Sequence, residues 1–193
     1  MKKGFTLVEL VIVTAIIIGI SGFGTANYLS FNEKQTIEQA AKTVKNNLRL
    51  IQQKAIAGEK DSGVCGPQAL AGWCLSPDDS TTANAYKLYG TCGDPADGVT
   101  LFPAVPVSID MPAGVTLTSR VYNDSIPGWE GEGERIRFGV LDGTVAFREL
   151  SHSKVTFCLQ GNLPSLDADD SYAITVSRTG EIIDEGYTSN CYP

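Results

Sequence analysis

The amino-acid sequence predicts an α+β fold, in which one long N-terminal helix, half transmembrane stalk and half amphipathic, packs on a C-terminal antiparallel β-sheet head. Three observations lead to this prediction. An apolar run extends from residue 5 to about residue 29, and apolar residues then recur at three- and four-residue steps as far as Ala55. From Val64 onward, short runs of strand-forming residues alternate with Gly, Pro, Asn and Asp, which is typical of antiparallel strands joined by turns.

The apolar run carries one carboxylate. Residues 4–13 read Gly-Phe-Thr-Leu-Val-Glu-Leu-Val-Ile-Val, and Lys2 and Lys3 precede them. As a helix, residues 5–29 would extend about 35 Å, enough to cross a bilayer with the N-terminus in the cytoplasm. A charge such as Glu9 is costly in such a segment and is normally retained for a use. A secretory signal peptide is the rival interpretation, but the basic region is short, no small-x-small cleavage site ends the run, and Glu9 would disrupt an ordinary apolar core. A plain single-pass anchor would leave Glu9 unexplained.

This arrangement closely resembles the N-terminal signature of type IV pilins and type II secretion pseudopilins, in which a short basic leader, Gly and Phe precede an apolar helix whose fifth mature residue is Glu. The resemblance implies a leader of residues 1–4, cut between Gly4 and Phe5 by a prepilin peptidase that also N-methylates Phe5. It further implies a bacterial inner-membrane location, an extracytoplasmic head, and assembly into a pilus or pseudopilus. The implied partners are other pilin subunits, an inner-membrane assembly platform and the lipid bilayer.

Glu9 is expected to set the register of that assembly. In a filament, Glu9 of one subunit can pair with the Phe5 amine of its neighbour, which relieves the cost of two poorly solvated charges with one contact. The alternative is that Glu9 reaches the lipid headgroups alone.

The helix is expected to continue through residues 30–57 as an amphipathic half. Its apolar stripe consists of Ile37, Ala40, Ala41, Val44, Leu48, Ile51 and Ala55. A stripe of this kind with a polar back packs against a domain. Gly58 is the predicted stop, and the head comprises residues 58–193.

The head is predicted to be one mostly antiparallel β domain. The strand candidates are Tyr86–Cys92, Val105–Ile109, Val115–Tyr122, Ile136–Val140, Thr144–Arg148, Lys154–Leu159, Tyr172–Ser177 and Glu181–Asp184. Asp142-Gly143 lies between two of these runs and is the strongest short-range hairpin signal, while residues 177–180 form a second turn. Residues 123–134 are expected to form an exposed loop, because they contain Pro, Gly and acidic residues without periodicity.

The tail carries a second resemblance. Residues 136–147 and 172–182 are similar to the two-hairpin pattern of GspH/FimT-type minor pseudopilins, in which a "Phe…Asp-Gly-Thr" turn is followed by a strand ending "Val-Ser…Thr-Gly". The family usually has a basic residue after that last Gly, where this chain has Glu181. The departure matters little to the turn, which needs the Gly. This resemblance favours a minor subunit.

All five cysteines fall in the head, and an exported head would meet an oxidising compartment in which disulfides persist. A Cys158–Cys191 bridge would join a strand to the tail, as pilins commonly do. The other three allow one further bridge, for which Cys65–Cys92 is favoured, leaving Cys74 unpaired. Zinc is the rival use of these residues. The chain has no Cys-x-x-Cys pair and a single His, so a zinc site is not expected.

No catalytic site is predicted, and no cofactor. His152 is the single His, and no nucleophile elbow, phosphate loop or dinucleotide fingerprint is present. The densest acidic cluster consists of Asp167, Asp169 and Asp170. These carboxylates offer oxygen ligands for Ca²⁺, but their spacing does not fit an EF-hand, and a solvated acidic loop is the favoured interpretation.

The formal net charge is −7, which removal of Lys2 and Lys3 with the leader would lower to −9. An acidic surface repels polyanions, so a nucleic acid is not an expected partner. A local basic patch remains open, and its candidate members are Arg120, Arg135, Arg137 and Arg148.

Two classes of function follow. The preferred one is a structural subunit of a type IV pilus or type II secretion pseudopilus, assembled through its N-terminal helix. The alternative is a membrane-anchored extracytoplasmic β domain that binds a ligand or acts as an enzyme, for which a cleft with convergent polar residues would be the evidence.

Overall fold

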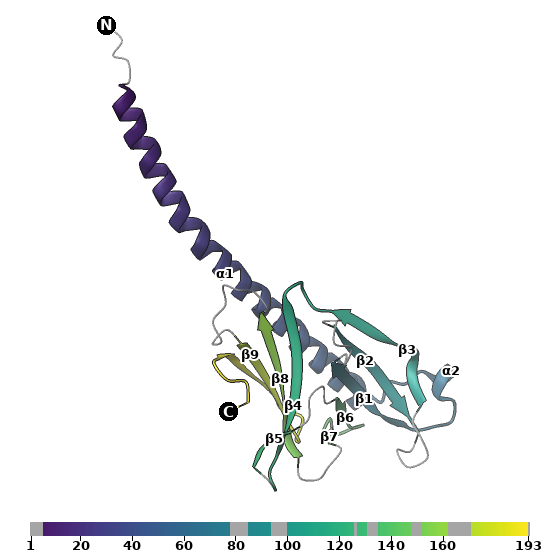
Figure 1. Ribbon diagram of the computed structural model, residues 1–193. Coiled ribbons are helices and arrows are strands. Elements are labelled where there is room, and N and C mark those ends of the chain that lie inside the picture. The colour runs from purple at the N-terminus through teal and green to yellow at the C-terminus, as the bar shows by residue number, and fades with distance from the viewer. Residues whose placement is uncertain are drawn as a thin grey trace.

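The computed structural model describes residues 6–77, 85–93, 100–125, 127–130, 135–147, 152–161 and 171–192, apart from the side chains at 21–30 and 104–105 (Figure 1). Its helices are α1 (Leu7–Ile56) and α2 (Ser62–Cys65). Its strands are β1 (Leu70–Pro77), β2 (Ala85–Cys92), β3 (Thr100–Asp110), β4 (Val115–Asn123), β5 (Gly128–Glu130), β6 (Ile136–Phe138), β7 (Val145–Ala146), β8 (His152–Gly161), β9 (Ser171–Ser177) and β10 (Ile182–Thr188).

The strands form two five-stranded antiparallel sheets. One has the order β3-β2-β1-β6-β7 and the other the order β10-β9-β8-β4-β5. The expected α+β fold with a single antiparallel sheet is therefore wrong, because the described protein is mostly β and its strands divide between two sheets. The physical reason is that periodicity identifies a strand but not its partner. Here β4 pairs with the distant β8, and β1 pairs with β6 as well as with β2. The chain therefore passes from one sheet to the other between β3 and β4, between β5 and β6, and between β7 and β8.

Both sheets and α1 contribute to one core. All seven positions of the apolar stripe on α1 are buried, and they share a single cluster with Leu75 of β1, Phe138 of β6, Phe157 of β8 and Ile174 of β9. Burying this many aliphatic and aromatic side chains is the main force that holds the helix to the head. The helix ends at Ile56, just before a glycine with φ of +65°.

Two strands were not expected from the sequence. β1 contains a glycine and ends in proline, which weakens its strand signal, yet it is the central strand of its sheet. β5 lies within residues 123–134, which were expected to form an irregular loop. That expectation is wrong for Gly128–Glu130, which is a three-residue strand paired with the end of β4. A strand of three residues is too short to show an alternating pattern in the sequence. Its pairing with β4 and the packing of Trp129 against Tyr122 stabilise it instead.

Among the described residues, no helix is both long and apolar enough to span a membrane. This finding contradicts the expected single-pass inner-membrane location and its transmembrane stalk at residues 5–29.

Two disulfides are formed. Cys65–Cys92 joins α2 to the end of β2, and Cys158–Cys191 joins β8 to the C-terminal segment. These are the pairs favoured from the sequence. Cys74 of β1 is a buried free thiol, and burial raises its pKa to about 11. At neutral pH it is therefore protonated and behaves as a small apolar side chain.

Candidate functional site

The N-terminal end of α1 begins with a capping box. Thr6 is the N-cap residue, and its hydroxyl accepts a hydrogen bond from the Glu9 backbone amide at 3.3 Å. In return, the Glu9 carboxylate accepts bonds from the Thr6 amide at 3.4 Å and the Thr6 hydroxyl at 3.3 Å. A negative charge in the first turn also interacts favourably with the helix dipole. Glu9 thus has a local structural role, which the Thr-x-x-Glu spacing in the sequence could have revealed.

The first half of α1 exposes large apolar side chains on every side of the helix. They include Leu7, Val8, Leu10, Val11, Ile12, Val13, Ile16, Ile17, Ile18 and Ile20, with exposed fractions from 47% at Val13 to 79% at Leu7. Figure 1 shows this half projecting away from the two sheets. Four of these residues are consecutive, so the exposed surface surrounds the helix and is not a single stripe. A helix that is apolar all round needs a partner to cover it.

The one polar side chain in the middle of this surface is satisfied internally. The Thr14 hydroxyl donates to the Leu10 carbonyl oxygen at 2.9 Å. Because that bond uses the hydroxyl proton within the helix, Thr14 presents mainly its methyl group to a partner. The surface from Leu10 to Ile20 is therefore chemically uniform.

The second half of α1 is fixed to the head by polar contacts as well as by its apolar stripe. The Lys45 ammonium lies 2.6 Å from the Asp184 carboxylate of β10, and the Tyr172 hydroxyl donates to the same carboxylate at 2.6 Å. Burial by itself raises the pKa of Asp184, but the hydrogen bonds donated by Lys45 and Tyr172 outweigh it and hold the pKa below its usual value. The Tyr187 hydroxyl donates to the Lys34 carbonyl oxygen. The head therefore sets the direction in which the exposed half points.

The predicted processing residues and calcium candidates are not placed by this structure. Gly4 and Phe5 lie outside the described residues, and so do Asp167, Asp169 and Asp170. Among the residues that are described, no group of three His, Cys, Asp or Glu side chains is arranged to hold a metal ion.

His152 is buried at the start of β8. Its Nε2 atom lies 3.6 Å from a carboxylate oxygen of Glu130, and its ring meets Phe147 edge to face. The Arg178 guanidinium donates to the His152 carbonyl oxygen. Among the described residues, these contacts of the ring are with a carboxylate and an aromatic ring, neither of which is the hydroxyl or thiol of a nucleophile–base pair.

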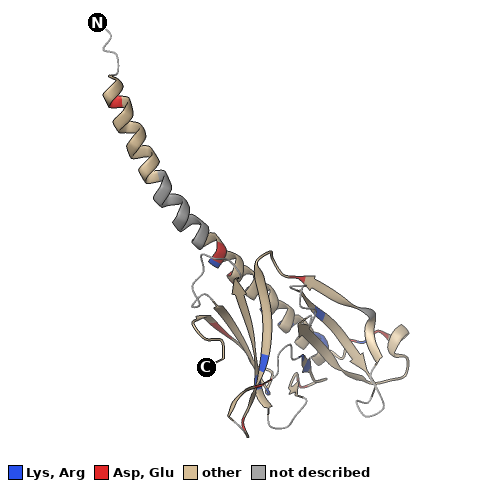
Figure 2. Ribbon diagram, in the orientation of Figure 1, with Lys and Arg blue, Asp and Glu red and all other residues tan. Residues whose placement is uncertain are grey.

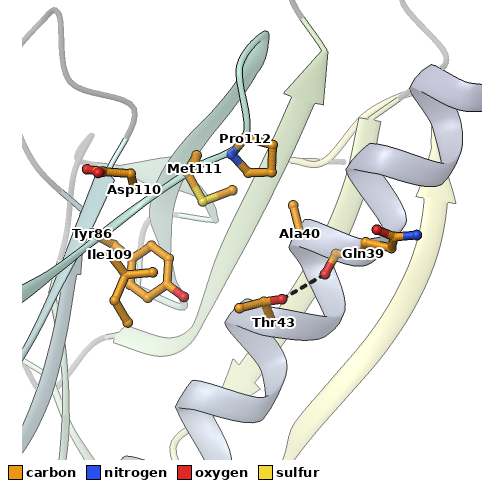
Figure 3. Close-up of a pocket in the computed structure, with 8 residues that line it drawn as sticks. All are labelled: Gln39, Ala40, Thr43, Tyr86, Ile109, Asp110, Met111 and Pro112. Atoms are coloured by element: carbon orange, nitrogen blue, oxygen red, sulfur yellow. Dashed lines mark hydrogen bonds between the residues drawn. The ribbon is translucent and has the colours of Figure 1, made fainter.

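A pocket of about 210 Å³ lies between α1, the start of β2 and the end of β3 (Figure 3). It is lined by Gln39, Ala40, Thr43, Tyr86, Ile109, Asp110, Met111 and Pro112. The Thr43 hydroxyl donates to the Gln39 carbonyl oxygen, and the Tyr86 hydroxyl accepts from Asn47. In Figure 3 the Gln39 amide and the Asp110 carboxylate point away from each other. The pocket is smaller than typical ligand sites, and its polar groups do not converge.

The four arginines of the possible basic patch are dispersed. Arg120 lies on β4 and Arg137 on β6, which belong to different sheets, and Arg148 lies outside the described residues. Arg135 precedes β6, and Arg135 and Arg137 both lower the pKa of the nearby Cys74 thiol against the larger effect of burial. Arg120 instead lies over the ring of Tyr192.

No family model matches the chain, and no curated protein or solved structure matches it either.

Proposed function

We propose that this protein is a structural subunit of a type IV pilus or a type II secretion pseudopilus, assembled through the first half of α1. The observation that supports the proposal is the exposed apolar surface from Leu7 to Ile20, which surrounds the helix and projects from a head that is itself well packed. The N-terminal resemblance, with Gly4, Phe5 and Glu9 in order, suggests which class of filament this is.

The energetics of this surface favour association between helices. Full burial of one Val, Leu or Ile side chain is worth about 1.5–3 kcal/mol relative to exposure. Ten such side chains that are roughly half exposed therefore make available on the order of 10 kcal/mol when neighbouring helices cover them. Association costs about 4–15 kcal/mol in lost translational and rotational freedom, so contacts with several neighbours are needed. A helical bundle of these stalks supplies such contacts, with the heads on the outside.

Processing is the first step of the proposed pathway, and the proposed enzyme is a prepilin peptidase that cuts between Gly4 and Phe5. Intact mass and N-terminal mapping of the full-length protein from its native host should give a chain beginning at N-methylated Phe5. A Gly4→Val variant should give a chain beginning at Met1, because the cleavage-site residue is lost. A wild-type chain beginning at Met1 would contradict the proposal.

Glu9 has two roles to separate, the observed cap of its own helix and the proposed pairing with the Phe5 amine of a neighbour. Glu9→Gln keeps the side-chain length and the capping oxygen but removes the charge. We expect it to reduce incorporation into filaments at least about tenfold, since a charge-assisted contact is lost. The measurement is the ratio of filament-bound to total protein by quantitative immunoblot.

Thr6→Ala is the matched control for this variant. It removes the capping hydroxyl at a cost of about 1 kcal/mol in helix stability but leaves the Glu9 charge in place. Its incorporation should stay close to that of the wild type. If Thr6→Ala lost as much incorporation as Glu9→Gln, capping and not pairing would be the function of Glu9.

A further inference from the structure

The outer face of the sheet β10-β9-β8-β4-β5 carries a cluster of aromatic and cationic side chains. We name this cluster, formed by Arg120, Tyr122, Trp129, Lys154 and Tyr192, the aromatic–cation surface. Strand register explains how it forms: Tyr122 of β4 is paired with Trp129 of β5 on one side and with Lys154 of β8 on the other. Side chains of directly paired residues lie on the same face, so the three form one row across the sheet.

The members of this surface contact one another closely. The ring centroids of Tyr122 and Trp129 are 5.3 Å apart, and those of Trp129 and Tyr192 are 5.4 Å apart. The Lys154 ammonium lies 4.9 Å from the Tyr122 centroid and 5.0 Å from the Trp129 centroid. The Arg120 guanidinium lies 5.0 Å from the Tyr192 centroid. All five side chains are half-buried, so each holds its position and still reaches solvent.

The tail residue of the surface is fixed by two bonds. Tyr192 follows Cys191, whose disulfide to Cys158 joins the tail to β8, and the Tyr192 hydroxyl shares a 2.9 Å hydrogen bond with the Thr118 hydroxyl of β4. Two interactions with different strands, β8 and β4, therefore hold the Tyr192 ring in place. A surface organised before binding loses little side-chain entropy when a partner arrives.

The composition of this surface is that of an interface. Trp, Tyr and Arg are the residues most enriched at protein–protein hot spots. Two cations also lie together here in a chain of net charge −7. The neighbouring carboxylate of Glu130 is directed elsewhere, toward the Asn123 amide at 3.1 Å and His152 at 3.6 Å. Among the described residues, the aromatic–cation surface therefore presents two cations, Arg120 and Lys154, which suit an acidic partner.

A second copy of the chain presents a suitable acidic surface at its strand β10. β10 is the edge strand at the far end of the same sheet, and Glu181 and Glu185 have exposed side chains on and just before it. Figure 2 shows acidic positions on β10, and the two cations of the aromatic–cation surface, Arg120 and Lys154, lie on β4 and β8. Asp184 is already engaged by Lys45 and Tyr172, and Ile183 adds a 41% exposed apolar side chain between the carboxylates. The β10 edge thus matches the aromatic–cation surface in charge and in apolar character.

We propose that the aromatic–cation surface of one head binds the β10 edge of a second copy. The two surfaces differ, so the contact is heterologous, and a heterologous contact between identical subunits can repeat without closing, as a helical filament requires. This inference rests on the proposed filament function and identifies which parts of neighbouring heads meet. Such a repeating contact belongs to a main filament subunit and not to the minor one that the tail pattern favours.

Zero-length carbodiimide cross-linking tests the contact directly. Isotopically heavy and light full-length chains are mixed in equal amounts in detergent micelles, cross-linked and digested, and the peptides are identified by mass spectrometry. We expect heavy–light links from Lys154 to Glu181 or Glu185. Trp129→Ala should reduce their yield at least tenfold, because Trp129 is the central ring of the surface. Only same-isotope links, or none, would overturn the proposal, and would leave a different acidic partner such as a polysaccharide for the surface.

Charge exchange keeps the test valid if Trp129→Ala perturbs the fold. Arg120→Glu combined with Lys154→Glu should abolish self-association of the heads, as should Glu181→Lys combined with Glu185→Lys. Mixing the two charge-reversed chains should restore a heterodimer in sedimentation velocity, and absence of that rescue would overturn the proposal.

Assembly through the first half of α1 is tested separately, by measuring how much of the chain is recovered in filaments. Filaments without heavy–light links overturn only the head contact, whereas heavy–light links without filaments overturn only the proposed function.

Discussion

Replacement of Gly180 by alanine is expected to lower the free energy of unfolding by about 3 kcal/mol or more. Gly180 has φ of +84°, where a residue with a Cβ pays about 1–2 kcal/mol. An added Cβ would also lie 2.2 Å from the Gly143 carbonyl oxygen and 2.8 Å from the Gln52 Nε2 atom. The first of these atoms is backbone, so the turn itself must shift, and overpacking of this kind typically costs about 1–3 kcal/mol.

The loss is large because three parts of the fold meet at this point. Gln52 of α1 donates to the Gly180 carbonyl oxygen at 2.7 Å, and its side chain also reaches the Gly143 carbonyl oxygen at 3.5 Å. The Val145 amide of β7 donates to the Arg178 carbonyl oxygen at 2.8 Å. The turn after β9 is thereby connected to the helix and to the other sheet. Displacing it disturbs contacts in both sheets at once.

Gly186→Ala is the matched control. Gly186 has φ of +78°, close to that of Gly180, but an added Cβ there meets no described atom within 4 Å. Its expected cost is therefore the conformational one alone, about 1–2 kcal/mol. Urea denaturation followed by circular dichroism compares the two variants. Equal losses in both would show that the close approach of the two turns contributes nothing.

Removal of the tail disulfide, as the double variant Cys158→Ala and Cys191→Ala, is expected to cost about 3–4 kcal/mol. The bridged residues are 33 positions apart, and a loop of that length loses about this much stability through the greater freedom of the unfolded chain. Both sulfur atoms are also buried, in a small cluster with Ala173 and the partly buried Tyr192. Guanidinium denaturation of the full-length chain measures the change.

Cys74→Ala is the control that distinguishes the contribution of the disulfide bond from that of burying a sulfur atom. It removes a buried thiol that forms no disulfide, and about 1 kcal/mol is the expected cost. A double variant within 1 kcal/mol of the wild type would contradict the prediction.

Removing the bridge also releases Tyr192 from β8. The double variant should therefore lose the heavy–light cross-links from Lys154 to Glu181 or Glu185 at denaturant concentrations where the sheet itself is still folded.

Local patterns determined those parts of the fold that depend on neighbours in sequence. The stripe from Ile37 to Ala55 is buried where its spacing predicts, because the helical repeat alone places those side chains on one face. The Asp142-Gly143 turn joins β6 to β7, since Gly143 has φ of +65° and the Asp142 carboxylate accepts from the Thr144 amide at 3.0 Å. The capping role of Glu9 is equally local, because it depends only on Thr6 lying three residues before Glu9.

Contacts between residues far apart in the chain could not be predicted from the sequence. The helix stripe, the turns, most strands and the exposed apolar segment could be predicted, because each depends on residues only a few positions apart. Three features could not: the division of the strands into two sheets, the close approach of Gly143 and Gly180, and the cluster that Trp129 forms with Arg120 and Tyr192. These outcomes depend on strand register and on one disulfide, which bring together residues up to 72 positions apart. Contacts at such separations are set by burial of the whole core and not by any local preference.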